Sequence, residues 1–159
     1  MVAEVEARLA SGAYSTVRSI VRSMSDDVVF YSIQAEDDAA RLLAGGAPWP
    51  TGPSRAHLGP GFYAWGDRAA AEAYMAHLGG RGASGMTIVE ARFGATDYAR
   101  MVTRDLTSMT DEAASAWLGQ FSGVGEAGVD HVIRETGRFG VEHRFGPDAF
   151  VAAILRVLP

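Results

Sequence analysis

The stretch "GPGFYAWGDRAAAEAY", residues 59–74, decides the expected fold. Glycine and proline lead into Phe62 and Tyr63, and an alanine-rich segment then carries a second tyrosine, Tyr74. Neighbours on a short strand point to opposite faces, so one of Phe62 and Tyr63 can join a core while the other faces a cleft. Asp67 is a suitable N-cap for the helix that follows. Small residues let this helix lie close to a sheet, which brings Tyr74 back toward Tyr63.

This arrangement allows two interpretations. Two tyrosine rings a short distance apart form a slot that can hold a flat heteroaromatic ring. Gly61, which has no side chain, would let the backbone approach such a ligand closely. Alternatively, both tyrosines are core aromatics whose hydroxyls reach water. The residues alone leave both interpretations open.

Composition limits the class of protein. The chain has 159 residues, 48% of them hydrophobic, which is enough for one domain with a core. It contains no cysteine, which excludes disulfides, thiolate catalysis and zinc–thiolate sites and suits a reducing cytosol. The formal charge of −5 argues against non-specific nucleic-acid binding. The acidic N-terminal stretch is not typical of a signal peptide, and no apolar run approaches the length of a membrane span.

The remaining sequence predicts strands and helices mixed without strict alternation, which indicates an α+β fold. We expect a single domain over residues 1–159, with a helical segment at 1–25 and a core at 26–159. The expected elements are strands at 26–34 and 86–94, a helix at 35–46, an irregular segment at 47–60, a turn at 79–85, a helix that Asp111 caps and that runs through Leu118, and a loop at 119–128. The end of the chain fits either two strands around Gly146-Pro147, or a strand, a short helix and a final strand.

From about residue 27 to 159, the sequence resembles the diphtheria-toxin-like branch of the NAD-dependent ADP-ribosyltransferases, which includes the poly(ADP-ribose) polymerases. The segment "GFYAWGDRAAAEAY" places Tyr63 and Tyr74 eleven residues apart, as in that family. The late "GRFGVEHRFGPDAF" is similar to its glutamate strand, with Glu142 in the matching position. The first motif departs from the family: "FYSIQ" puts Tyr31 or Ser32 where the family has a histidine.

The resemblance implies a split mixed β-sheet with flanking helices around an NAD-binding cleft. It implies a mono-ADP-ribosyltransferase of the bacterial toxin or effector type, in which NAD is the substrate and no metal is needed. The acceptor would be a macromolecule, a protein rather than a nucleic acid, met in the cytoplasm or in the cytosol of a target cell, with no role for a membrane. The alternatives are a catalytically inactive nucleotide-binding or interaction module, and an NAD glycohydrolase.

The same resemblance assigns the site residues. Glu142 would stabilise the positive charge that develops on the ribose, and nicotinamide would lie between the two tyrosine rings. The residues expected to contact NAD are Tyr31, Ser32, Gly61, Phe62, Tyr63 and Tyr74. We favour Glu142 over Glu135 as the catalytic carboxylate because "GVEHRF" alternates like a strand, whereas Glu135 is expected to face solvent.

The four histidines lack the spacing of a metal site. His57 lies in the Pro/Gly-rich segment and is expected at the surface, unless that loop folds over the cleft. His143 is expected to point to the opposite strand face from Glu142.

Overall fold

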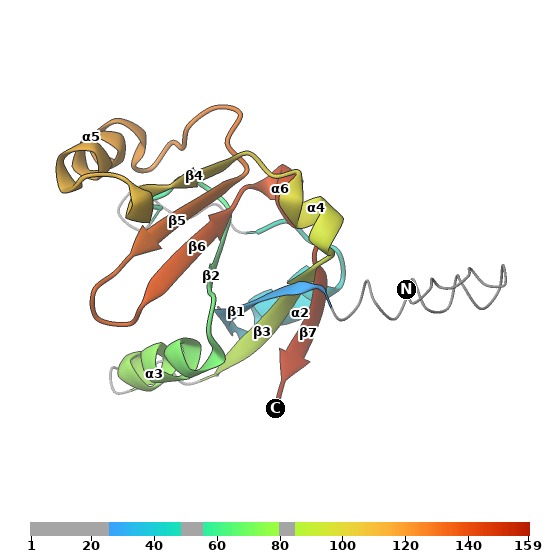
Figure 1. Cartoon of the computed structure of the whole chain (residues 1–159). Helices are drawn as coiled ribbons and strands as arrows, with labels where there is room; N and C mark the ends of the chain where they lie inside the picture. The colour runs from blue at the N-terminus through green and yellow to red at the C-terminus, as the bar shows by residue number, and fades with distance from the viewer. Residues whose placement is uncertain (1–25, 49–55, 80–84) are drawn as a thin grey trace, which may run out of the picture.

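The computed structural model describes residues 26–48, 56–79 and 85–159 (Figure 1). The described strands form a seven-stranded mixed sheet in the order β4-β5-β6-β2-β1-β3-β7, in which only the β4–β5 pair is parallel. The strands are β1 (Val28–Ala35), β2 (Phe62–Trp65), β3 (Met86–Phe93), β4 (Thr103–Asp105), β5 (His131–Glu135), β6 (Val141–Phe145) and β7 (Ile154–Leu158). The helices are α2 (Glu36–Leu43), α3 (Arg68–Gly79), α4 (Ala95–Ala99), α5 (Asp111–Phe121) and α6 (Pro147–Phe150), with a 3₁₀ turn, η1, at Leu106–Ser108. This confirms the α+β class.

The strands fall into two groups joined loosely at the middle. In Figure 1, β4, β5 and β6 lie with α5 at one side, and β1, β3 and β7 lie with α2 at the other. β1 pairs with β3 along all eight residues, but with β2 at a single register position, Tyr31 opposite Trp65. The Ser32 hydroxyl donates a hydrogen bond of 2.6 Å to the Tyr63 carbonyl and so ties β1 to β2 where the ladder is short.

Sequence patterns explain the first half of the described sheet. β1 is a run of β-branched and aromatic residues, and α2 carries three acidic residues in its first turn, where they interact favourably with the helix dipole. The Asp67 carboxylate accepts a 3.2 Å hydrogen bond from the Ala69 amide at the start of α3. Phe62 is buried at 1% exposure while Tyr63 is only partly buried, as the alternation on β2 predicts.

In the second half of the chain, the observed elements differ from the expected ones. Thr110, not Asp111, caps α5, since its hydroxyl accepts a 3.1 Å bond from the Ala113 amide. α5 runs on to Phe121, so the loop begins at Ser122 and not at residue 119. The end of the chain follows the second alternative, with β6, α6 and β7 in sequence. The predicted helical segment at 1–25 and most of the turn at 79–85 lie outside the described residues.

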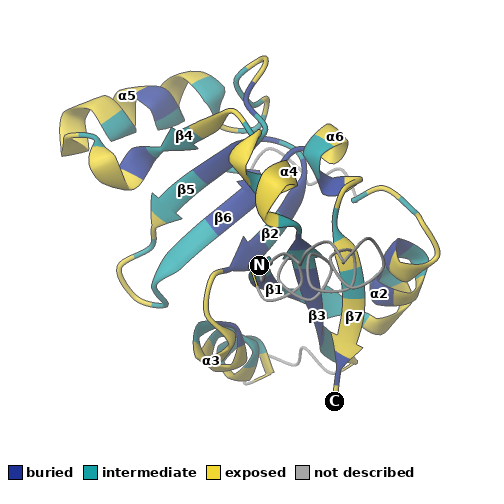
Figure 2. Cartoon of the chain, turned by 45° about the vertical axis from the view of Figure 1, so that its right-hand side comes forward, coloured by how far each residue is buried: buried dark blue, intermediate teal, exposed yellow. Residues whose placement is uncertain are grey.

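The two faces of the sheet are packed differently. One face carries a continuous core built on Phe30, Phe62, Phe93, Phe145 and Phe150. The other carries two separate clusters: the α5 cluster (Leu58, Leu106, Trp117, Val129, Val132) and the α3 cluster (Trp65, Ala71, Ile88, Leu158). Figure 2 shows the buried residues gathered on the central strands and the exposed outer sides of α3 and α5. A space therefore remains between the two clusters on this second face. No helix in the described ranges has the length and apolar character to cross a bilayer.

Candidate functional site

A cavity of about 300 Å³ lies between the α5 cluster and the α3 cluster. It is lined by residues of β1, the 56–60 turn, β2, α3 and β6: Ile33, His57, Tyr63, Ala64, Trp65, Tyr74 and Glu142. Three of the residues predicted for the site, Tyr63, Tyr74 and Glu142, therefore meet at one cavity although they come from three elements. Its volume is at the lower end of the range for small-molecule sites, which suits one part of a ligand.

The two tyrosines line this cavity from different clusters. Tyr63 packs against the α5 cluster and Tyr74 against the α3 cluster. The Tyr74 ring is held at 5.4 Å from Trp65 and 5.1 Å from Phe139, measured between ring centroids. Within the described part of the chain, the rings of Tyr63 and Tyr74 make no contact with each other, and both line the cavity.

The Tyr63 hydroxyl is already used by the protein. It accepts a 2.9 Å bond from the Leu58 amide and donates a 2.6 Å bond to the Gly59 carbonyl. Burial raises the pKa of Tyr63 to about 12, so the phenol keeps its proton and remains a donor. Tyr63 can therefore offer a ligand mainly its ring face.

Glu142 enters the cavity from the sheet. Its register partner on β2 is Trp65 and on β5 is Arg134, so all three side chains share the cavity face. Arg134 Nη2 donates a 3.1 Å bond to Glu142 Oε1, and the Glu142 side chain is 16% exposed. Among the described residues, no group bonds the second carboxylate oxygen. That oxygen can accept a hydrogen bond from a ligand hydroxyl. Glu135 at the end of β5 is exposed, as expected.

The other predicted contact residues lie elsewhere. Ser32 is fully buried, and its hydroxyl donates a hydrogen bond to the Tyr63 carbonyl. Gly61 lies against β6, where an added Cβ would come 2.2 Å from the Phe145 carbonyl oxygen. Phe62 faces the core on the opposite side of the sheet. Tyr31 packs against the α3 cluster beside the cavity. Of the described residues that line the cavity, none is among these four.

His57 is the residue that sequence reasoning placed at the surface and the structure places at the cavity. It is half-buried and lines the space together with Glu142. The only sequence signal is its position in the segment before β2, a loop that could fold over the cleft. His143, by contrast, points to the opposite face, as expected, and lies buried against His131.

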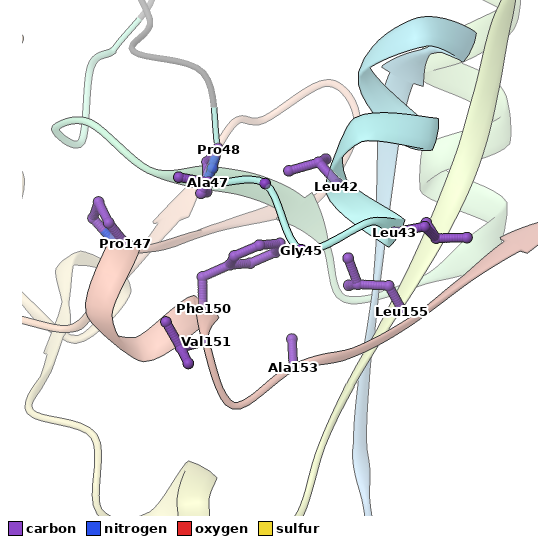
Figure 3. Close-up of a pocket in the computed structure, with 11 residues that line it drawn as sticks. Leu42, Leu43, Gly45, Ala47, Pro48, Pro147, Phe150, Val151, Ala153 and Leu155 are labelled. Atoms are coloured by element: carbon purple, nitrogen blue, oxygen red, sulfur yellow. The ribbon is translucent and has the colours of Figure 1, made fainter.

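A second cavity, of about 360 Å³, lies among α2, α6 and β7 (Figure 3). Its lining is aliphatic and aromatic, including Leu42, Phe150 and Leu155, and it also contains two prolines, Pro48 and Pro147. None of the described residues that line it can exchange a proton or hold a charge. We take the 300 Å³ cavity as the candidate site because it combines a carboxylate and an imidazole with two tyrosine rings. No group of three or more potential metal ligands occurs in the described ranges.

The sequence matches no protein-family model, and no curated protein is significantly similar to it.

Proposed function

We propose that the protein is an NAD-dependent mono-ADP-ribosyltransferase that modifies a macromolecular acceptor, as an effector-type domain. The observation that carries this proposal is the meeting of Tyr63, Tyr74 and Glu142 at one cavity. A cavity lined by two phenol rings suits the flat nicotinamide ring. A carboxylate beside it suits the ribose attached to that ring. The opening between β1 and β2, where one register pair remains, is compatible with a split sheet.

In the proposed reaction, the bond between the nicotinamide nitrogen and the ribose C1 breaks, and its electron pair leaves with nicotinamide. A nucleophile of the acceptor forms the new bond to C1 and releases its proton to water. Positive charge develops on the ribose as the bond lengthens. Glu142 would accept a hydrogen bond from a ribose hydroxyl through its unpaired oxygen and stabilise that charge, while Arg134 holds the other oxygen in place.

A second candidate, a module that binds a nucleotide without turnover, is favoured by a specific observation. The Arg134 guanidinium already pairs with Glu142, and this pairing lowers the charge that the carboxylate presents to a ligand. The Ser32 hydroxyl, at one of the two positions where the resembled family has its histidine, is bonded to the protein backbone. Such a protein would bind NAD and release no nicotinamide.

The test is nicotinamide release from NAD, followed by chromatography with and without a mixture of candidate acceptor proteins. We expect Glu142→Gln to abolish turnover, because the neutral amide stabilises the developing charge far less. Its affinity for NAD should stay within about tenfold of the wild type, roughly 1.4 kcal/mol. Glu135→Gln is the matched control: the same change on an exposed side chain outside the cavity should keep full activity.

The outcomes separate the candidates. Release that requires an acceptor supports transfer, and release in water alone indicates NAD hydrolysis. Binding by calorimetry without release supports the module. Full activity of Glu142→Gln would remove Glu142 from the mechanism, and the absence of both binding and release would refute the proposed function.

A further inference from the structure

His57 lies on a turn whose backbone is fixed on both sides. Its neighbours Ala56 and Leu58 are both fully buried. The Ala56 carbonyl accepts a 2.7 Å bond from the Gly123 amide, and the Leu58 side chain belongs to the α5 cluster. A turn held between two buried residues fixes the backbone of His57, from which the side chain reaches the cavity.

Tyr63 fastens the same turn to the cavity wall. Its hydroxyl bonds the amide of Leu58 and the carbonyl of Gly59, the two residues that follow His57. Gly59 has a φ of +100° and packs so closely on Gly125 that an added Cβ would come 2.6 Å from the Gly125 Cα. Only glycine fits this position without displacement. One wall residue of the cavity therefore also sets the position of the histidine.

The ring of His57 is available to a ligand. No described residue hydrogen-bonds it, although it is half-buried and lines the same cavity as Glu142. The Tyr63 hydroxyl is committed to the turn, and a carboxylate at Glu142 can only accept. A neutral imidazole offers one donor and one acceptor. The imidazole therefore gives the cavity a hydrogen-bond donor. Neither the Tyr63 hydroxyl nor the Glu142 carboxylate can provide one.

We propose that His57 is a substrate-binding residue of this cavity, whose imidazole hydrogen-bonds the nicotinamide–ribose half of the bound molecule. The identity of that molecule rests on the proposed function. The residue contributes affinity and orientation, whereas Glu142 contributes stabilisation of the charge that develops later.

The experiment compares His57→Ala and His57→Asn with the wild-type full chain by calorimetry with NAD and by nicotinamide release. We expect His57→Ala to weaken NAD binding at least tenfold and to raise KM more than it lowers kcat, because the lost bond is made to the bound substrate. Asn keeps a donor and an acceptor and should recover part of the affinity. AMP, which lacks the nicotinamide half, should bind the wild type and His57→Ala equally, or neither of them. Urea unfolding midpoints should stay near the wild-type value, since the ring makes no bond to the described protein.

Each result is decisive. Wild-type affinity for NAD in His57→Ala, with the wild type itself binding, overturns the role of His57 and leaves the proposed function standing. A fall in kcat at unchanged KM and Kd overturns the assignment of His57 to binding. A wild-type protein that binds no NAD overturns the proposed function and this inference together.

Discussion

His131 and His143 form a buried pair, and burial favours the neutral form of both rings in the folded state. They lie on the core face of the sheet, with His131 Nε2 2.9 Å from His143 Nδ1 and Thr103 Oγ1 3.1 Å from His131 Nδ1. The rings stack at 10°, and His131 also stacks on Phe145. Burial lowers the pKa of His131 to about 3 and that of His143 to about 4, both from an ordinary value of 6.5.

Lowering the pH from 7 to 5 should therefore destabilise the protein. The unfolded chain binds protons at both histidines in this range, whereas the folded state does not. The stabilisation is fully present above pH 6.5 and is lost as the pH falls toward the folded values of about 3 and 4. Between pH 7 and pH 5, each group costs about 2 kcal/mol and the pair about 4 kcal/mol. That is a large part of an ordinary free energy of unfolding.

Urea unfolding at pH 7, 6 and 5 measures this loss. His143→Gln removes one of the two titrating groups, so the loss between pH 7 and pH 5 should fall to about half, whatever the stability of the variant at pH 7. The pKa values of Glu90 and Glu126 are lowered by their arginine partners, so their contribution is lost mainly below this window. A free energy of unfolding that stays constant from pH 7 to pH 5, or an unchanged loss in His143→Gln, would refute the buried neutral pair.

Two further substitutions test how β2 is positioned. Gly61→Ala should cost at least about 2 kcal/mol in urea unfolding, because the residue has a φ of +152° and its Cβ would lie 2.2 Å from the Phe145 carbonyl oxygen. Gly119→Ala, in a helix with open space around it, is the control and should stabilise slightly; equal effects would contradict this account. Tyr63→Phe should cost about 1–3 kcal/mol and speed hydrogen exchange at the Leu58 amide, which loses its acceptor. Unchanged protection of that amide would show that the bond does not hold the turn.

The parts of the fold that were predicted correctly depend on local patterns. β1, α2, β2, α3 and β3 each carry their signal in adjacent residues: β-branched runs, an acidic first turn, a cap at Asp67, a period of two. The placement of Glu142 rested on the same period of two, which separated it from the buried His143. The alternation of apolar and polar residues along a strand predicts which side chains are buried, because one face of the strand packs on the core.

The parts that were missed depend on partners distant in the sequence. β4 is only three residues long and forms a strand because it pairs in parallel with β5. The paired residues Thr103 and His131 are 28 positions apart in the sequence. His57 was expected at the surface because proline and glycine surround it. Its place at the cavity is set by the Tyr63 hydroxyl and by the contact of Gly59 with Gly125, neither of which leaves a periodic signal.

The candidate site contains two kinds of residue: those that also hold the fold together, and those that only line the cavity. Tyr63 lines the cavity, and its hydroxyl also hydrogen-bonds the turn that carries His57. Changes at Tyr63 should therefore alter stability and ligand binding together. Glu142 is bonded to Arg134 by a partly exposed pair, which contributes little to stability. Changes at Glu142 should therefore alter chemistry while leaving the fold intact. A loss of activity at Glu142 without a loss of stability is the result that distinguishes a reactive carboxylate from a structural one.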